Sequence, residues 1–199
     1  MNVRLQYDLD FLAGIYYDER LQLNSYSIST SLLTKTTDAA STNIAMDRLK
    51  YFVHGELANT VFVNQDSRER AEMMQIMGIN ITTLPEEPVD QIVGMMLYYK
   101  LNAIMEGRMT VSRLDLSSIL GDSVWYQHDE DDAWGPFRED GWWHASTIQH
   151  DSILESVTAD NIVRVIPNAW HELGLIWPEQ ETEPTANTVV FANFSKNED

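Results

Sequence analysis

A long amphipathic helix that leads directly into a strand constrains this chain more than any other feature. Pro88 suits the first helical position, where the missing N–H has no intrahelical partner to lose. Beyond it, apolar residues recur at the three-and-four spacing of one helix face: Val89, Ile92, Val93, Met96, Leu97, Leu101 and Ile104. Gly107 stops the helix, and residues 109–116 then alternate polar and apolar. A unit of this kind is typical of a helix lying across a sheet.

Two strands are predicted near the N-terminus. Residues 3–11 alternate as a half-buried antiparallel strand does, with Arg4, Gln6, Asp8 and Asp10 on one face. Gly14 and the pair Asp18–Glu19 are expected in a connection. Residues 21–33 predict the second strand, and their change of parity predicts a bulge near Asn24–Ser25.

Two helices are predicted between these strands and the central helix. Asp38, Ser41 or Thr42 is expected to cap the first. Asp66 with Glu69 is expected to form a capping box for a shorter second helix, which Gly78 ends.

Residues 109–116 and 123–128 predict a hairpin around Gly121–Asp122. The whole order of elements predicts an α+β fold, an antiparallel sheet with helices packed on one face. Residues 1–128 form this core domain, and residues 129–199 form an acidic, aromatic-rich extension with short strands, including residues 188–194 at its end.

The charge of the chain restricts its partners. A formal net charge of −18 disfavours nucleic acid and anionic membranes, because both are bound chiefly by Lys and Arg. The acidic surplus is usually explained by solubility; the alternative is mimicry of nucleic acid or capture of a basic partner. No apolar run is long enough to cross a bilayer, and the absence of cysteine fits a cytosolic protein.

No motif in the chain points to a cofactor or a catalytic centre. The five histidines lack metal-ligand spacing, so no zinc is expected. A metal held by His128, Asp129, Asp131 and His144 is conceivable, but an acidic loop on such a charged protein is more often simply solvated. Nucleophile elbows and glycine-rich phosphate loops are absent from the sequence.

An aromatic group in the extension has two interpretations. It comprises Trp134, Phe137, Trp142 and Trp143, interleaved with acidic residues. The group is either an exposed surface for a protein partner or a small core that fixes the extension to the sheet. We favour the second interpretation, because exposed tryptophans are costly.

The order of two strands, helices and two further strands resembles the tunnelling fold of 6-pyruvoyl-tetrahydropterin synthase and GTP cyclohydrolase-like proteins. The resemblance covers residues 2–128 and includes the turn at Leu57-Ala58-Asn59 and the long helix within Pro85–Ile104. Where the synthases carry a zinc-binding HxH, this chain has Asn24-Ser25-Tyr26-Ser27, and their catalytic cysteine is absent. The resemblance therefore implies no zinc chemistry, but it implies rings formed by pairing edge strands.

A second resemblance implies a localisation but no activity. Pro85–Gln91 and Tyr98–Asn102 are similar to segments of uncharacterised marine cyanophage proteins. That likeness implies the cytoplasm of a host cell or a virion.

Two hypotheses follow. The first is a non-catalytic, phage-type accessory or structural protein that forms a homo-oligomer through the edges of its sheet, including residues 3–11, and binds a protein partner. The alternative is a divergent tunnelling-fold enzyme or binder of a purine- or pterin-like molecule at a subunit interface. The resemblance gives Asp115 as its acidic anchor, with Glu19 and His54 as further ligand-binding candidates.

Overall fold

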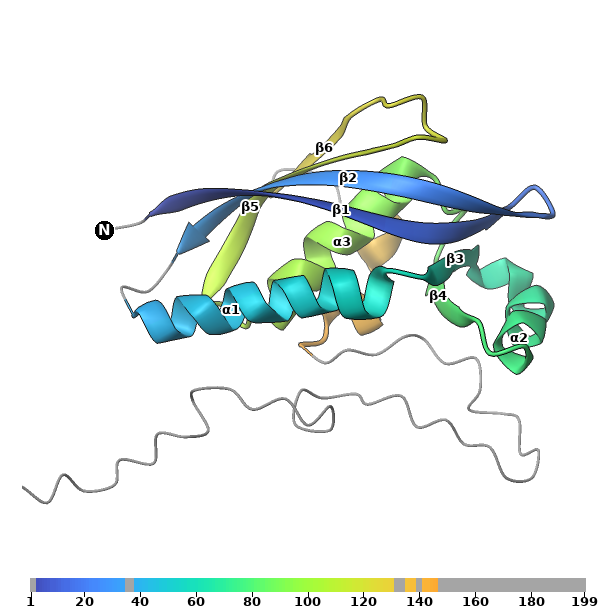
Figure 1. The fold of residues 1–199 in the computed structure, drawn as a ribbon, viewed down its shortest axis with the longest axis horizontal. Coiled ribbons are helices and arrows are strands. Elements are labelled where there is room, and N and C mark those ends of the chain that lie inside the picture. Colours follow the sequence, from blue (N-terminus) through green and yellow to red (C-terminus); the bar gives the residue numbers. More distant parts are fainter. Residues whose placement is uncertain (1–2, 35–37, 131–134, 139–140, 147–199) are drawn as a thin grey trace, which may run out of the picture.

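Residues 3–34, 38–130, 135–138 and 141–146 are described by the computed structural model. One sheet has the strand order β4-β3-β1-β2-β5-β6 (Figure 1). Its strands are β1 (Arg4–Tyr17), β2 (Arg20–Thr34), β3 (Thr60–Asn64), β4 (Asn80–Leu84), β5 (Met109–Ser118) and β6 (Tyr126–Asp129). The helices are α1 (Ala39–Tyr51), its π-helical continuation (Phe52–Leu57), α2 (Arg68–Ile76) and α3 (Asp90–Ile104), with 3₁₀ turns at Gln65–Ser67, Gly135–Arg138 and Trp142–His144.

Strands β1 and β2 form one long hairpin that runs the length of the molecule (Figure 1). The turn falls at Asp18 and Glu19, as expected, and both have positive φ. Gly14 lies inside β1 rather than in the connection. Glycine is needed at this position because a Cβ would meet the Val61 side chain of the adjoining β3.

The bulge predicted near Asn24–Ser25 is wrong. The β1–β2 register runs without a break, and the irregularity lies instead where β2 meets β5, between Ser31 and Leu32. The parity of the apolar residues changes because Leu21 and Leu23 lie exposed on the outer face, while Tyr26 is buried on the inner face.

The fold is α+β, as predicted, but its sheet is mixed. Strand β3 pairs parallel with β1 at Gly14, Ile15 and Tyr16, and β4 pairs parallel with β3. Pairs β1–β2, β2–β5 and β5–β6 are antiparallel, which confirms the predicted hairpin of residues 109–116 and 123–128.

The helices divide between the two faces. Helices α1 and α3 cover the inner face, where alternate residues of β1, β2 and β5 join one core with both helices. A second cluster, formed by Val61, Val63, Ala71, Met74 and Ile81, packs α2 against the opposite face of β3 and β4. The expectation of helices on one face alone therefore holds for α1 and α3 but not for α2.

The helix caps agree with the sequence at one of two places. Asp38 accepts hydrogen bonds from the N–H groups of Ala40 and Ser41 and so caps α1, as expected. The capping box of Asp66 and Glu69 is wrong, because the N-cap of α2 is Ser67, without a side-chain bond. Asn64 caps the preceding 3₁₀ turn instead.

The central helix α3 is buried over most of its surface. Its stripe is confirmed, with Leu97 and Leu101 fully buried, although Val89 lies just before the helix and is exposed. Within the described residues, no helix is long and apolar enough to cross a membrane.

We predict that Leu97→Asp prevents stable folding. The substitution places a carboxylate where the side chain has no exposed surface, and an unpaired buried charge costs several kcal/mol. Circular dichroism with urea denaturation measures the loss. Gln91→Asp, at an exposed position of the same helix, should change the unfolding midpoint little, and an unchanged midpoint in Leu97→Asp would contradict the packing of α3.

Candidate functional site

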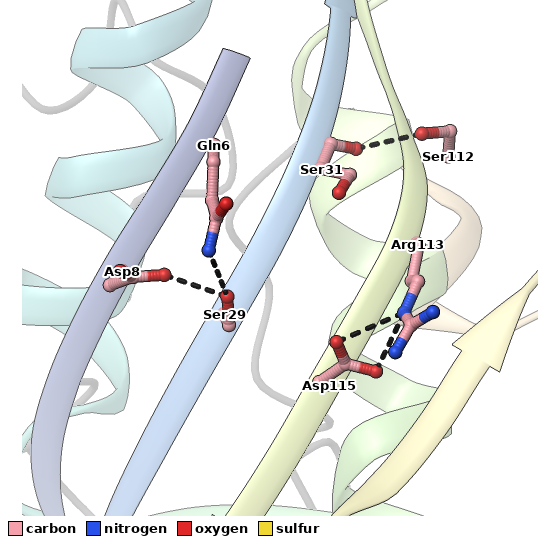
Figure 2. A network of polar contacts seen from close by, with 7 residues as sticks. All are labelled: Gln6, Asp8, Ser29, Ser31, Ser112, Arg113 and Asp115. Carbon is pink, nitrogen blue, oxygen red and sulfur yellow. Dashed lines mark hydrogen bonds and ion pairs between the residues drawn. The ribbon is translucent and has the colours of Figure 1, made fainter. Parts of the chain in front are cut away.

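The outer face of β1, β2, β5 and β6 forms a polar surface, which we call the open face. Figure 2 shows how its side chains bond across the strands, with Ser29 Oγ donating to Asp8 at 2.7 Å and Gln6 Nε2 donating to Ser29 at 3.3 Å. On β5, Arg113 Nε donates to both carboxylate oxygens of Asp115, at 2.9 and 3.0 Å. These bonds orient the carboxylates on the open face.

The open face becomes apolar toward the β1–β2 turn. Leu12, Leu21 and Leu23 are 50%, 52% and 72% exposed there. The adjoining β5–β6 connection adds four exposed apolar residues: Ile119, Leu120, Val124 and Trp125. Exposed apolar side chains gathered in this way are typical of an interaction surface.

Among the described residues, one edge of β1 is unpaired over part of its length. The Leu12 carbonyl accepts a hydrogen bond from Asn59 N–H on the side away from β2, so the backbone groups of alternate residues face the same way. These residues are Arg4, Gln6, Asp8 and Asp10. Within the described part of the chain, β3 reaches β1 only at residues 14–16, and no strand pairs with this edge of residues 4–11. We call this stretch the free edge.

The three ligand-binding candidates lie on separate elements. Asp115 lies on the open face, opposite Ser29, and is bound by Arg113. Glu19 lies in the exposed β1–β2 turn, and His54 is exposed in the π-helix, on the helical side of the sheet. The structure does not bring these candidates together.

A buried polar cluster at the start of α3 was missed by the sequence analysis. Ser118 Oγ lies 2.8 Å from both carboxylate oxygens of Asp90, and Gly121 N–H donates to Ser118 Oγ at 3.0 Å. Asn24 and Tyr26 are buried beside them, and Asn24 Oδ1 accepts a hydrogen bond from Leu120 N–H. An acidic residue directly after Pro88 and Val89, in a first helical turn, was the available signal.

Burial determines the titration of this cluster. Desolvation raises the pKa of Asp90, against the opposing hydrogen bonds from Ser118. Desolvation also raises the pKa of the Tyr26 hydroxyl, with a smaller contribution from the negative charge of Asp90. The chemistry available here is that of a desolvated carboxylate, which favours bonds to N–H donors.

The metal candidates do not form a site within the described residues. No group of three His, Asp or Glu side chains among them is arranged to hold an ion. His128 is buried against Gly94 of α3, while Asp129 is exposed and His144 Nε2 lies 3.0 Å from the Phe137 carbonyl oxygen. Asp131 lies outside the described residues.

Three aromatic residues of the extension lie inside the core. Phe137, Trp142 and Trp143 are buried and join the cluster around α3, as the small-core interpretation expects. They therefore present little surface to a partner. Trp134 lies outside the described residues, as do residues 188–194 and the other predicted strands of the extension.

Lys100 fixes residues 142–145 of the extension on α3. Its side chain is fully buried, and Nζ donates to the carbonyl oxygens of Trp142 and Ala145 at 2.8 and 3.1 Å. Nζ also lies 4.9 Å from the ring centroid of Trp142 and 5.9 Å from that of Phe52. Burial lowers the pKa of Lys100 to about 7.

Comparisons with known proteins give likenesses of fold. No family model and no curated protein matches this sequence. An uncharacterised protein from Wolinella succinogenes is similar in structure, with a TM-score of 0.47 and 11% identity over 66% of this chain and 99% of that one. Two catalytic-residue mutants of 6-pyruvoyltetrahydropterin synthase from Plasmodium vivax each give a TM-score of 0.42 and 10% identity, over 64% of this chain and 97% of theirs.

We predict that Lys100 makes stability rise with pH. Between about pH 7 and 10 the unfolded chain binds the lysine proton and the folded chain does not, so the free energy of unfolding increases by up to about 1.4 kcal/mol per pH unit. Urea denaturation at pH 7.5, 8.5 and 9.5 measures this slope. Lys100→Met should remove it, whereas Lys50→Met, at an exposed position of α1, should keep it. Equal slopes in all three proteins would contradict the lowered pKa.

Proposed function

We propose that this protein is a non-catalytic structural or accessory module that associates with copies of itself along its sheet and holds a protein partner on its open face. The observation that carries the proposal is the free edge of β1. Unpaired N–H and C=O groups along a regular strand invite pairing with another strand. The edge is also free of proline and extends over the whole first half of β1.

The polar groups of the open face support a structural role. Asp8, Asp10 and Asp115 each accept hydrogen bonds from neighbouring side chains of the sheet. Carboxylates held in this way fix the surface and its charge. Their arrangement suits recognition of a surface better than proton transfer, which needs a group poised to exchange a proton with substrate.

The net charge opposes association but does not forbid it. Copies with a charge of −18 repel each other, yet at physiological salt the Debye length of about 8 Å limits the repulsion to close contacts. Backbone pairing can proceed in the plane of the sheet while most acids face solvent. The same charge favours a basic partner on the open face, with apolar groups that cover Leu12, Leu21 and Leu23.

A second candidate function is binding of a purine- or pterin-like molecule. One observation favours it, the buried carboxylate of Asp90 beside Asn24 and Tyr26. A carboxylate accepts two parallel N–H bonds from an amidine-like edge, such as the amino-pyrimidine edge of guanine or a pterin.

We predict that the protein is a symmetric homo-oligomer and that Asp8→Pro makes it monomeric. Proline removes the N–H that Asp8 presents at the free edge but leaves the β1–β2 hydrogen bonds, which belong to the neighbouring residues. Light scattering coupled to size-exclusion chromatography measures the mass, with 22.8 kDa for one chain.

Asp8→Ala is the matched control, because it removes the same carboxylate and keeps the N–H. It should remain assembled. A wild-type mass of 22.8 kDa across micromolar concentrations would reject the proposal.

For the second candidate function, we predict that guanine or pterin retained by the wild-type protein is lost from Asp90→Asn. The amide can accept only one of the two N–H bonds, so affinity should fall about tenfold or more. Native mass spectrometry reports bound ligand and stoichiometry together. Asp10→Asn, on the open face, is the control, and wild-type protein that retains no ligand would count against this candidate.

A further inference from the structure

From the free edge we infer its partner and register: β1 of a second copy pairs antiparallel with it around a two-fold axis at Tyr7, so that Arg4 faces Asp10 of the second copy. This inference rests on the proposed self-association and specifies it. Three features of β1 support it: the extent of the free edge, the charges along it, and the residues beneath it.

The extent of the free edge restricts the register. The bond from Asn59 to the Leu12 carbonyl closes the edge at one end, and the start of β1 limits the other. In an antiparallel pair of identical strands, every residue from Arg4 to Asp10 has a partner when Arg4 of each copy faces Asp10 of the other. The two-fold axis then passes through Tyr7.

The side chains of the free edge are self-complementary in this register. Arg4 faces Asp10 of the second copy, and Gln6 faces Asp8 of the second copy, each twice because of the symmetry. Opposite charges and amide–carboxylate pairs directly across two strands stabilise their pairing. These four side chains are exposed and belong to the residues whose backbone groups also face the edge.

Other registers fit less well. Moving the axis to Asp8 places the two copies of Asp8 opposite each other, and it requires the Leu12 carbonyl, which Asn59 already occupies. Moving it to Gln6 still pairs Arg4 with Asp8 of the second copy, but it leaves Asp10 outside the paired stretch and places the two copies of Gln6 opposite each other. The register centred on Tyr7 is therefore favoured because it uses the whole free edge and gives all four of its polar side chains a complementary partner.

The inner side of the seam is apolar. Leu5 and Tyr7 are only partly buried in the single chain and pack at the margin of its core. In the inferred register Leu5 faces Leu9 of the second copy, and the two Tyr7 side chains meet at the axis. Pairing would bury apolar surface that the single chain leaves partly exposed. Lys50 Nζ, 5.8 Å from the centroid of the Tyr7 ring, lies over this position and can move aside because it is exposed.

A charge exchange between exposed residues tests the register. Arg4→Asp and Asp10→Arg should each weaken the dimer about tenfold or more, since each places like charges opposite one another twice. The double variant should restore the wild-type dissociation constant, measured by analytical ultracentrifugation. Exchange of Arg4 with Asp8 instead, in the variant Arg4→Asp/Asp8→Arg, should not restore it.

A disulfide tests the axis directly, because the chain contains no cysteine. Tyr7 pairs with its own copy at a non-hydrogen-bonded position, where Cα atoms lie about 4.5 Å apart, within disulfide range. Oxidised Tyr7→Cys should therefore form a covalent dimer. Leu12→Cys is the matched control, because its copies lie on the order of 30 Å apart in this register and should not cross-link.

The outcomes separate the two proposals. A wild-type protein that stays monomeric overturns self-association and this inference together. An oligomer that Asp8→Pro disrupts, but that shows neither charge rescue nor the Tyr7→Cys cross-link, keeps the proposed function and overturns the register. Rescue together with selective cross-linking at Tyr7 supports both.

Discussion

The pairing of β1 governs the arrangement of the rest of the molecule. The strand pairs with β2 along its whole length but with β3 only at Gly14, Ile15 and Tyr16. Its C-terminal part is therefore flanked by strands on both sides, whereas among the described residues no strand pairs with the outer edge of residues 4–11. The close approach of β3 depends on Gly14, since any side chain there would meet Val61.

Helix α3 is held by polar contacts at its start and in its second half, and not by apolar packing alone. At its start, Asp90 binds Ser118 and so ties the helix to the end of β5. In its second half, Lys100 binds the carbonyl groups of Trp142 and Ala145 and holds the extension on the helix layer. Both groups are buried and ionisable, so their removal from water costs free energy that their hydrogen bonds offset. Phe137, Trp142 and Trp143 of the extension thus share one hydrophobic interior with the core.

The sequence predicted those elements whose residues carry a one-sided pattern. The alternation of β1 is visible because its first part has one buried and one exposed face, and α3 is visible through the helical spacing of its apolar residues, although most of its surface is buried. Strand β3 is buried throughout and lacks this alternation. Its residues therefore do not indicate which face of the strand is turned to which layer, and its parallel pairing with β1 could not be predicted.

The site was harder to predict, because it depends on contacts between distant residues. Asp90 and Ser118 are joined across the long helix and a strand, and nothing in their local sequences specifies that contact. Leu21 and Leu23 led to an incorrect bulge because exposed leucines were taken as buried. A large apolar residue in a sequence is not necessarily a core residue, and these two leucines belong to the surface.

The free edge and the open face are not independent surfaces. Arg4, Gln6, Asp8 and Asp10 direct their backbone groups to the edge and their side chains to the open face. The alternate residues Leu5, Tyr7 and Leu9 bond to β2 through their backbone and point into the core. Pairing at the edge would therefore extend the open face across the seam without exposing the core. Under the proposed function, a partner that contacts Asp8 or Asp10 would also contact the pairs that join two copies, so assembly and partner binding would be thermodynamically coupled.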